Sequence, residues 1–212
     1  MKKEIAIGVL GFQGDIEENV VAAKQAMDEL GVKGSVELVR YPEEIERVDG
    51  LVLPGGESTV QSSLAAIQRS LPALKKRIAD GMPVLGTCAG MIMLSKRAFD
   101  RVVGETKQKT IGSLDVTVER NAFGRQNDSF EADLRIDALG KAPFKGVFIR
   151  APAVSEATTG KDVEVIARHA NKIVAVRQKN IIGTAFHPEL AGDARMHRQF
   201  VRMVLDYKRA GG

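Results

Sequence analysis

Pro83-Val84-Leu85-Gly86-Thr87-Cys88-Ala89-Gly90 joins a short apolar run to a helix that residues Ala89–Arg97 are expected to form. The order is strand, then a nucleophile between two glycines, then helix. This order is typical of the tight turn that lifts a reactive side chain above a parallel sheet. Gly86 and Gly90 leave the space that such a turn requires. The start of the helix favours negative charge, which stabilises a thiolate on Cys88.

Cys88 is the only cysteine, so it forms no disulfide within the chain. The backbone N–H of Ala89, the next residue, is expected to face the oxygen that becomes negative when the sulfur attacks a carbonyl carbon. The other interpretation of this turn is a buried structural cysteine among glycines. The rest of the sequence has to distinguish the two.

Short apolar strands and amphipathic helices alternate through the first hundred residues. Short, continuous apolar runs are typical of strands that are buried on both faces. The alternation predicts a mostly parallel sheet with helices on both faces, as in flavodoxin-like α/β folds. The expected strands are 5–10, 36–39, 50–53 and 83–86, and the expected helices are 16–30, 60–70, 71–80 and 89–97.

The second half of the chain is richer in strands. Its polar stretch 120–133 is expected to be an ordered loop, and 193–208 a final helix. No repeat, low-complexity tract or linker interrupts the sequence, so a single α/β domain over residues 1–212 is expected. The strands expected in this half are 114–119, 146–149, 163–168, 173–176 and 181–186.

The composition excludes several classes of protein. Hydrophobic residues make up 44% of the 212 and charged residues 27%, as in ordinary globular proteins. No apolar run approaches the ~20 residues of a membrane span. The short, quickly interrupted apolar run after Met1-Lys2-Lys3 does not resemble a secretory signal, so a cytoplasmic protein is expected.

The net charge of +4 gives little support for a nucleic-acid partner. Residues 195–212 carry five basic side chains and one acidic one, so this segment accounts for the whole net charge of +4. Cations near the C-terminal end of a helix are favoured by its dipole. The chain has two tyrosines and no tryptophan, so residues that stack on bases are scarce.

His187-Pro188-Glu189 follows the apolar run 181–186 and supplies what a nucleophilic thiol needs. His187 is a candidate base for the thiol, and the turn at Pro188 allows Glu189 to orient the imidazole. The alternative is a surface turn with a solvated histidine and glutamate. The His187-Pro188-Glu189 turn and the cysteine turn together favour the catalytic interpretation.

Pro54-Gly55-Gly56-Glu57-Ser58-Thr59 follows another strand. Two glycines allow backbone amides to approach a ligand closely, so this loop is a candidate for a second oxyanion donor and for substrate contacts. Ser58 or Thr59 is alternatively the cap of the next helix. A phosphate loop is disfavoured because the lysine of the Gly-Lys-Ser/Thr pattern is missing.

Arg120 and Arg150 each end a strand-like segment. Arginine grips a carboxylate through two parallel hydrogen bonds, which suits an amino-acid substrate. Structural salt bridges are the alternative role for both.

These motifs together resemble the class I, triad-type glutamine amidotransferases, and within that class the glutaminase subunit of pyridoxal 5′-phosphate synthase. The resemblance covers residues 5–208, with Phe12 where many relatives carry leucine; segment 97–113 matches poorly, and no role is assigned to it. The further motifs that carry it are Gly8-Val-Leu-Gly-Phe-Gln-Gly14, Glu119-Arg-Asn-Ala-Phe-Gly-Arg-Gln126, Asp128-Ser-Phe-Glu-Ala-Asp133 and Val147-Phe-Ile-Arg-Ala-Pro152.

The resemblance implies a role for each matching position, with neither a cofactor nor a metal. Cys88, His187 and Glu189 would form the catalytic triad. Gly56 and Ala89 would supply the oxyanion donors, and Gln13 would lie near them and near the partner interface. The residues implied in glutamine binding are Gly56, Glu57, Ser58, Arg120, Ile149 and Arg150.

The implied activity is hydrolysis of L-glutamine to glutamate and ammonia, with the ammonia passed to a separate synthase subunit for vitamin B6 biosynthesis. No part of the sequence resembles a phosphosugar-binding synthase, so the acceptor site is expected on another chain. Two alternatives stay open. One is another cysteine hydrolase, such as a DJ-1-like protein or a gamma-glutamyl hydrolase, and the other is a non-catalytic module that regulates a partner.

Overall fold

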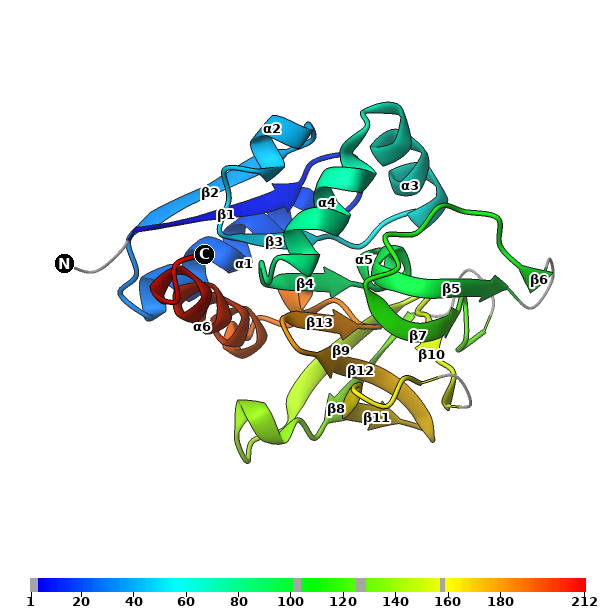
Figure 1. Ribbon diagram of the computed structural model, residues 1–212. Helices are drawn as coiled ribbons and strands as arrows, with labels where there is room; N and C mark the ends of the chain where they lie inside the picture. The colour runs from blue at the N-terminus through cyan, green and yellow to red at the C-terminus, as the bar shows by residue number, and fades with distance from the viewer. Residues whose placement is uncertain (1–3, 101–103, 125–128, 157–158) are drawn as a thin grey trace.

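The computed structural model describes residues 4–100, 104–124, 129–156 and 159–212. Strands and helices alternate in its first half (Figure 1). The elements of this half are β1 (Ile5–Leu10), α1 (Ile16–Glu29), β2 (Gly34–Val39), α2 (Pro42–Ile45), β3 (Gly50–Leu53), α3 (Ser58–Ile67), α4 (Ser70–Ala79), β4 (Val84–Thr87) and α5 (Ala89–Leu94).

Strands dominate the second half of the chain. The elements are β5 (Ser95–Asp100), β6 (Gly104–Glu105), β7 (Leu114–Glu119), β8 (Ser129–Leu134), η1 (Asp137–Leu139), β9 (Phe144–Ile149), β10 (Ala153–Val154), β11 (Glu164–His169), β12 (Lys172–Gln178), β13 (Ile181–Thr184), η3 (Pro188–Leu190) and α6 (Arg195–Arg209).

The parallel part of the main sheet has the order β2-β1-β3-β4-β13. β12 and β10 continue it in antiparallel pairing, and β7, β5 and β6 lie beyond them. Figure 1 shows α1 and α6 on one face and α3 and α4 on the other. The carboxyl ends of β1, β3, β4 and β13 meet at one edge, where ligands bind in open α/β sheets. The expected α/β fold is therefore confirmed.

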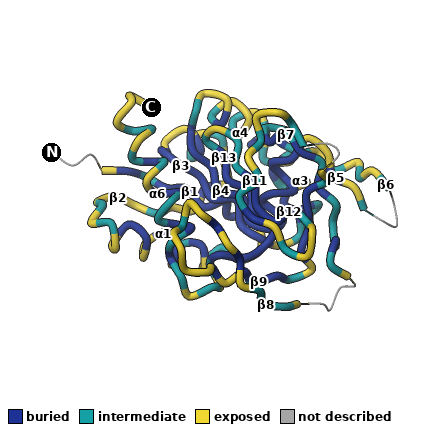
Figure 2. Tube along the Cα trace, turned by 90° about the horizontal axis from the view of Figure 1, so that it is seen from below, coloured by how far each residue is buried: buried dark blue, intermediate teal, exposed yellow. Residues whose placement is uncertain are grey.

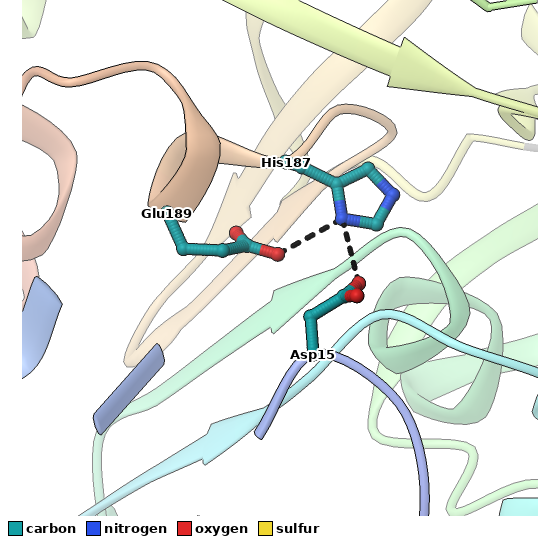
Figure 3. A group of neighbouring side chains, drawn as sticks. All are labelled: Asp15, His187 and Glu189. Atoms are coloured by element: carbon teal, nitrogen blue, oxygen red, sulfur yellow. Dashed lines mark hydrogen bonds and ion pairs between the residues drawn. The ribbon is translucent and has the colours of Figure 1, made fainter. Parts of the chain in front are cut away.

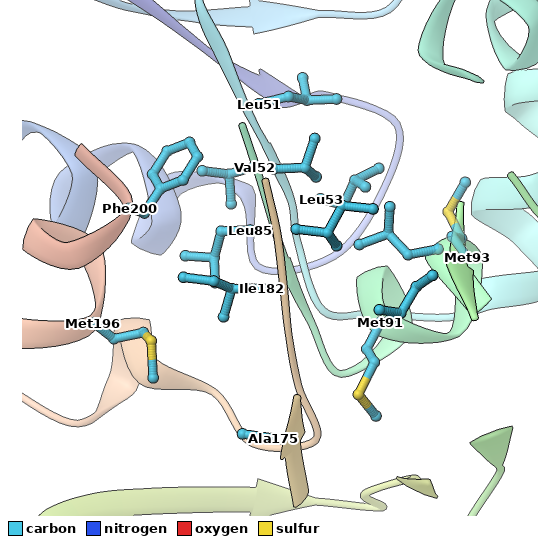
Figure 4. Packing of buried hydrophobic residues seen from close by; sticks show 14 of the residues in the cluster. Leu51, Val52, Leu53, Leu85, Met91, Met93, Ala175, Ile182, Met196 and Phe200 are labelled. Atoms are coloured by element: carbon cyan, nitrogen blue, oxygen red, sulfur yellow. The ribbon is translucent and has the colours of Figure 1, made fainter. Parts of the chain in front are cut away.

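The core lies on both faces of this sheet. Figure 4 shows Phe200 and Met196 of α6 on one side of the strands and Met91 and Met93 of α5 on the other. The central strands are buried along their whole length, whereas the outer surfaces of the helices are exposed (Figure 2). The continuous apolar runs of β3 and β4 follow from this burial on two sides.

The helix expected over Ala89–Arg97 is shorter than predicted. It ends at Leu94, and Ser95 begins strand β5. The Ser95 hydroxyl lies within hydrogen-bond distance of the carbonyl oxygens of Ile92 and Arg97. A side chain thus replaces a helical N–H group as the donor to these backbone carbonyls, and the chain continues in an extended conformation. The structure thus contradicts the C-terminal end of the predicted helix.

The loop expected over 120–133 is only partly a loop, and its residues 125–128 lie outside the described residues. Strand β8 begins at Ser129 and pairs with β9 in antiparallel register. Its polar residues alternate with Phe130, Ala132 and Leu134, a period of two that the polar composition concealed. Met1-Lys2-Lys3 at the N-terminus and part of segment 97–113, residues 101–103, also lie outside the described residues.

Four of the five lysine and arginine residues of α6 form ion pairs with described residues. Lys208 contacts Asp49 at 2.8 Å, and Arg198 pairs with Glu29. Lys208 and Arg209 lie in the last turn, where cations are favoured. Among the described residues, no helix has the length and apolar character needed to span a membrane.

Candidate active site

Cys88 stands at the tight turn between β4 and α5. Its backbone has φ 47° and ψ −103°, a conformation that L-residues rarely adopt. The glycines on either side are required by space: a Cβ on Gly90 would lie 2.0 Å from the carbonyl oxygen of Leu53, and one on Gly86 would lie 2.5 Å from Leu94. The strained turn predicted from the sequence is present.

His187 follows β13 and is 3% exposed at its side chain. Its backbone N–H donates to the carbonyl oxygen of Val147 at 2.8 Å. Figure 3 shows two carboxylates that face the same ring nitrogen: Nδ1 lies 2.9 Å from Oε1 of Glu189 and 3.1 Å from Oδ2 of Asp15. Nε2 is buried and has no hydrogen-bond partner of ordinary geometry among the described residues.

The surroundings of His187 favour its charged form. Burial alone would lower the pKa of the ring, but the hydrogen bond with Asp15, the nearby Cys88 sulfur and the hydrogen bond with Glu189 together raise it to about 12. The same contact with His187 lowers the pKa of Asp15 against the effect of its partial burial. These contacts favour the imidazolium, the form that donates a proton to a leaving amine.

The glycine pair after β3 makes room for this histidine. A Cβ on Gly55 would lie 2.3 Å from Cε1 of His187 and 2.6 Å from Oδ2 of Asp15. A Cβ on Gly14 would lie 1.7 Å from the carbonyl oxygen of Gly55. The loop after β1 and the loop after β3 thus touch through their backbones, and glycines permit that contact.

A buried amide holds these two loops together. The Gln61 side chain of α3 donates from Nε2 towards the carbonyl oxygens of Gln13, Pro54 and Gly55, at 2.8, 3.2 and 3.1 Å. Gln13 also contacts the second loop directly, because its Oε1 accepts from the backbone N–H of Glu57 at 2.8 Å.

Glu57 is the N-cap of α3, so neither Ser58 nor Thr59 fills that position as the alternative interpretation expected. Oε1 of Glu57 accepts from the hydroxyl of Thr59 at 2.9 Å and from the guanidinium of Arg120 at 2.9 Å. Ser58 donates instead to Gln108. The capping residue is thereby tied to the arginine at the end of β7.

Arg120 and Arg150 differ in their surroundings. Arg120 is 19% exposed at its side chain and forms the ion pair with Glu57, whereas Arg150 is exposed and has φ 45°. Among the described side chains, no acidic partner within 4 Å is found for Arg150. Both arginines border the same cavity.

A cavity of about 300 Å³ opens where the strand ends meet, at the small end of the ~300–1,000 Å³ typical of small-molecule sites. The structure brings most of the predicted residues to it. Glu189 is buried behind His187, and Ala89 does not line the cavity wall. The lining residues are Gln13, Gly14, Asp15, Gly56, Glu57, Ser58, Cys88, Ile92, Arg120, Asn121, Ile149, Arg150 and His187.

Sequence reasoning missed Asp15, Asn121 and Ile92. Asp15 lies two residues beyond Gln13, in the loop after β1, and this position among converging strand ends was the available signal. Asn121 has φ 50°, a conformation that no motif in the sequence predicts. Ile92 is an ordinary apolar residue of α5 and carries no sequence signal for a site.

Asp15, His187 and Glu189 are of the residue types that bind metal ions, and their ligand atoms lie within 4.8 Å of one another. Both carboxylates, however, face the same ring nitrogen at N–H···O distances. The Glu189 contact has hydrogen-bond geometry, and the Asp15 contact is an ion pair with the same nitrogen.

The mostly parallel α/β sheet, with a cavity at its strand ends, defines the class of protein: an α/β fold of the glutamine amidotransferase type. The chain belongs to the SNO glutamine amidotransferase family, whose model matches residues 9–206. This membership agrees with the resemblance found in the sequence.

Several relatives are similar over nearly their whole length. The chain is 52% identical over 199 residues to "Pyridoxal 5'-phosphate synthase subunit PdxT" of Streptomyces coelicolor, covering 93% of each chain. It is 48% identical over 202 residues to the protein of the same name from Nitrosopumilus maritimus, covering 95% of this chain and 98% of that one. A solved structure described as a glutamine amidotransferase superposes with a TM-score of 0.79 at 41% identity, over 93% of this chain and 98% of that one.

Proposed function

We propose that this protein is the glutaminase subunit of a pyridoxal 5′-phosphate synthase. It hydrolyses L-glutamine to L-glutamate and ammonia and passes the ammonia to a separate synthase subunit. Family membership and the names of the relatives support this assignment. The observation that carries it is the strained Cys88 in one cavity with the buried, carboxylate-bound His187.

In the proposed first step, the Cys88 thiolate attacks the side-chain amide carbon of glutamine. The negative oxygen that forms accepts hydrogen bonds from the backbone N–H groups of Gly56 and Ala89. When the tetrahedral intermediate collapses, the C–N bond breaks and the His187 imidazolium gives its proton to the leaving ammonia. A thioester on Cys88 remains.

In the second step, water attacks the thioester and His187, now neutral, takes a proton from it. Glutamate leaves and the thiolate returns. The role proposed for Glu189 is to hold the imidazole through Nδ1, from which Oε1 lies 2.9 Å away. Its complete burial supports a fixed orienting role, because a side chain packed on all sides does not change conformation readily.

The opposite end of the cavity is proposed to bind the α-amino and α-carboxylate groups of glutamine. Arg120 is the candidate for the carboxylate, and Ile149 and Arg150 pack around the substrate. Gly56, Glu57 and Ser58 supply backbone and side-chain contacts from the loop after β3. A site that binds both charged groups of an amino acid requires both signs of charge, and Glu57 and Arg120 provide them side by side.

A partner is implied by the chemistry of the product. Ammonia released into water at neutral pH is mostly ammonium and reacts poorly as a nucleophile. A glutaminase in a biosynthetic enzyme is therefore useful when a second active site receives the ammonia before it is protonated. We propose that the synthase subunit docks over the cavity entrance.

Ammonia release from L-glutamine, measured with and without a candidate synthase subunit, tests the proposal. We expect release with the partner and none from Cys88→Ser in the same complex. [¹⁵N-amide]glutamine should also label the ring nitrogen of the pyridoxal phosphate formed. Faster cleavage of a gamma-glutamyl peptide than of glutamine would instead support a gamma-glutamyl hydrolase. Full activity of Cys88→Ser would rule out this cysteine mechanism.

A further inference from the structure

His187 faces two carboxylates through one nitrogen (Figure 3). Glu189 comes from η3, two residues along the chain, whereas Asp15 comes from the loop between β1 and α1. A histidine ring has at most one proton on Nδ1, and two carboxylate oxygens lie 2.9 and 3.1 Å from that nitrogen. A triad needs only one of them.

Asp15 occupies the N-cap position of α1, yet its side chain makes no capping hydrogen bond. An aspartate at this position ordinarily accepts from the backbone of the first turn. Here the carboxylate contacts His187 instead, while the backbone is fixed independently: the carbonyl oxygen of Asp15 accepts from Nδ2 of Asn19 at 2.7 Å, and its N–H donates to Gly55 at 3.4 Å. The side chain is thus aimed at the imidazole by a rigid loop.

The two carboxylates have different surroundings. The side chain of Glu189 is 0% exposed, and its Oε2 has no hydrogen-bond partner among the described residues. The side chain of Asp15 is 33% exposed. Water can therefore solvate the Asp15 carboxylate whether or not it accepts from Nδ1, whereas the buried Glu189 carboxylate depends on His187 for a hydrogen bond.

We propose that Asp15 is a second positioning residue for His187, sharing the Nδ1 proton with Glu189 and orienting the imidazole when Glu189 does not. The proposal rests on the proposed function, in which His187 is the catalytic acid and base. It adds a residue to the site that the triad Cys88, His187 and Glu189 does not include.

One consequence is partial redundancy. Removing the Glu189 carboxylate leaves an acceptor 3.1 Å from Nδ1, so the ring keeps its orientation. Removing both leaves the buried nitrogen without an acceptor, and the ring is then free to rotate away from Cys88. The other charged groups of this cavity, Glu57, Arg120 and Arg150, stay in place in each variant.

A double-mutant cycle of Asp15→Ala and Glu189→Ala, which remove the acceptor oxygens altogether, tests the redundancy when glutaminase turnover is assayed in the complex with the synthase subunit. Each single variant should keep measurable activity. The double variant should lose at least ~10-fold more kcat than the product of the single losses, since residues that share one partner couple. Loss equal to that product would overturn the proposal. Asp15→Ser repeats the cycle if Asp15→Ala does not fold.

A second measurement does not require catalysis. The ¹⁵N signals of the His187 ring, assigned by their loss in His187→Asn, report its titration in the isolated chain. We expect the ring to lose its proton at lower pH in Asp15→Asn and in Glu189→Gln, and lowest in the double variant. Glu17→Gln is the matched control, because it removes a charge from the exposed first turn of α1.

Unchanged titration of His187 in Asp15→Asn would overturn the proposal even if the cycle were non-additive. Absence of ammonia release by the wild-type complex would refute the proposed function instead, and the titration would then decide the Asp15 contact alone. The two failures are therefore distinguishable.

Discussion

At the scale of single residues, three of the seven described non-glycine residues with positive φ line the cavity. Cys88, Asn121 and Arg150 have φ values of 47°, 50° and 45°, and all three line it. Each such conformation costs of the order of 1–3 kcal/mol and persists only when its surroundings impose it. The rest of the fold thus holds the site in a geometry that an isolated segment would not adopt.

His187→Asn and Glu189→Gln should differ strongly in their effect on turnover. Without His187 the thiol has no base and the leaving group no acid, so we expect kcat to fall by several orders of magnitude. Glu189→Gln should keep part of the activity, because it weakens the support of the imidazole and leaves the proton carrier, His187, in place. Steady-state kinetics of the complex measure both. A greater loss in Glu189→Gln than in His187→Asn would mean that these roles are assigned wrongly.

Arg120→Ala should affect binding more than chemistry. The α-carboxylate lies far from the scissile amide, so its contact is expected to be equal in ground and transition states and to change KM much more than kcat. Arg135→Ala, at an ion pair exposed to solvent, is the control. An unchanged KM for glutamine in Arg120→Ala would leave Arg120 with a structural role through Glu57 only.

Asp15→Asn should change stability in a pH-dependent way. The hydrogen bond with His187 lowers the pKa of Asp15 below its ordinary value of 3.8. A carboxyl group whose pKa is lowered by folding stabilises the folded state at pH values above its pKa in the unfolded chain. This stabilisation is lost as the pH falls through the lower pKa of the folded state. Urea denaturation should therefore show the wild-type advantage at pH 5 and its disappearance in stronger acid. A difference that is constant with pH would contradict the contact.

At the scale of elements, the sequence predicts best where a short apolar run is followed by residues that end it, such as glycine or proline. The buried runs of β1, β3 and β4 are continuous and apolar, so they are recognisable as central strands. The start of β5 resembles the end of a helix because the whole of α5, before Ser95, is apolar and buried and gives no period. Strand β8 escapes prediction because polar residues on its exposed face dominate its composition.

The turn between β4 and α5 should be intolerant of a single methyl group. In Gly90→Ala the new Cβ would lie 2.0 Å from a backbone oxygen, which cannot move without displacing β3. We expect a loss of at least ~1–3 kcal/mol in the free energy of unfolding. Gly11→Ala is the control, since its nearest neighbour is 3.2 Å away in the flexible side chain of Arg40. Equal melting temperatures of the two variants would contradict this account.

At the scale of the whole molecule, the site combines residues from segments that lie far apart in the chain. Motifs identify Cys88 and His187 because each lies in a short pattern with chemical meaning. Asp15 directly follows the motif Gly8–Gly14 but has no catalytic pattern of its own, and its importance arises only when the loop after β1 meets His187, 172 positions along the chain. Long-range contacts of this kind depend on strand order, which the sequence does not state.

Control by the partner is expected at this scale. A glutaminase that worked without an acceptor would waste glutamine, and Gln13 contacts the loop that carries Gly56. We expect the isolated chain to be nearly inactive, since one absent oxyanion donor lowers the rate by ~10²–10³-fold. Docking of the synthase is expected to complete the donor pair, and Gln13→Ala to reduce that activation. Glutaminase rates of both proteins, alone and with saturating partner, test this; full activity of the lone wild-type chain would refute it.

The amide of Gln61 has a consequence for motion. Because one side chain binds carbonyl oxygens on both loops, neither loop can separate from the other without breaking its bonds. The pair should behave as a single opening unit in native-state hydrogen exchange, with the amide protons of Asp15 and Glu57 exchanging at one common rate. The ring orientation of the histidine and the arrangement of the glycine loop would then be gained and lost together, as one cooperative transition.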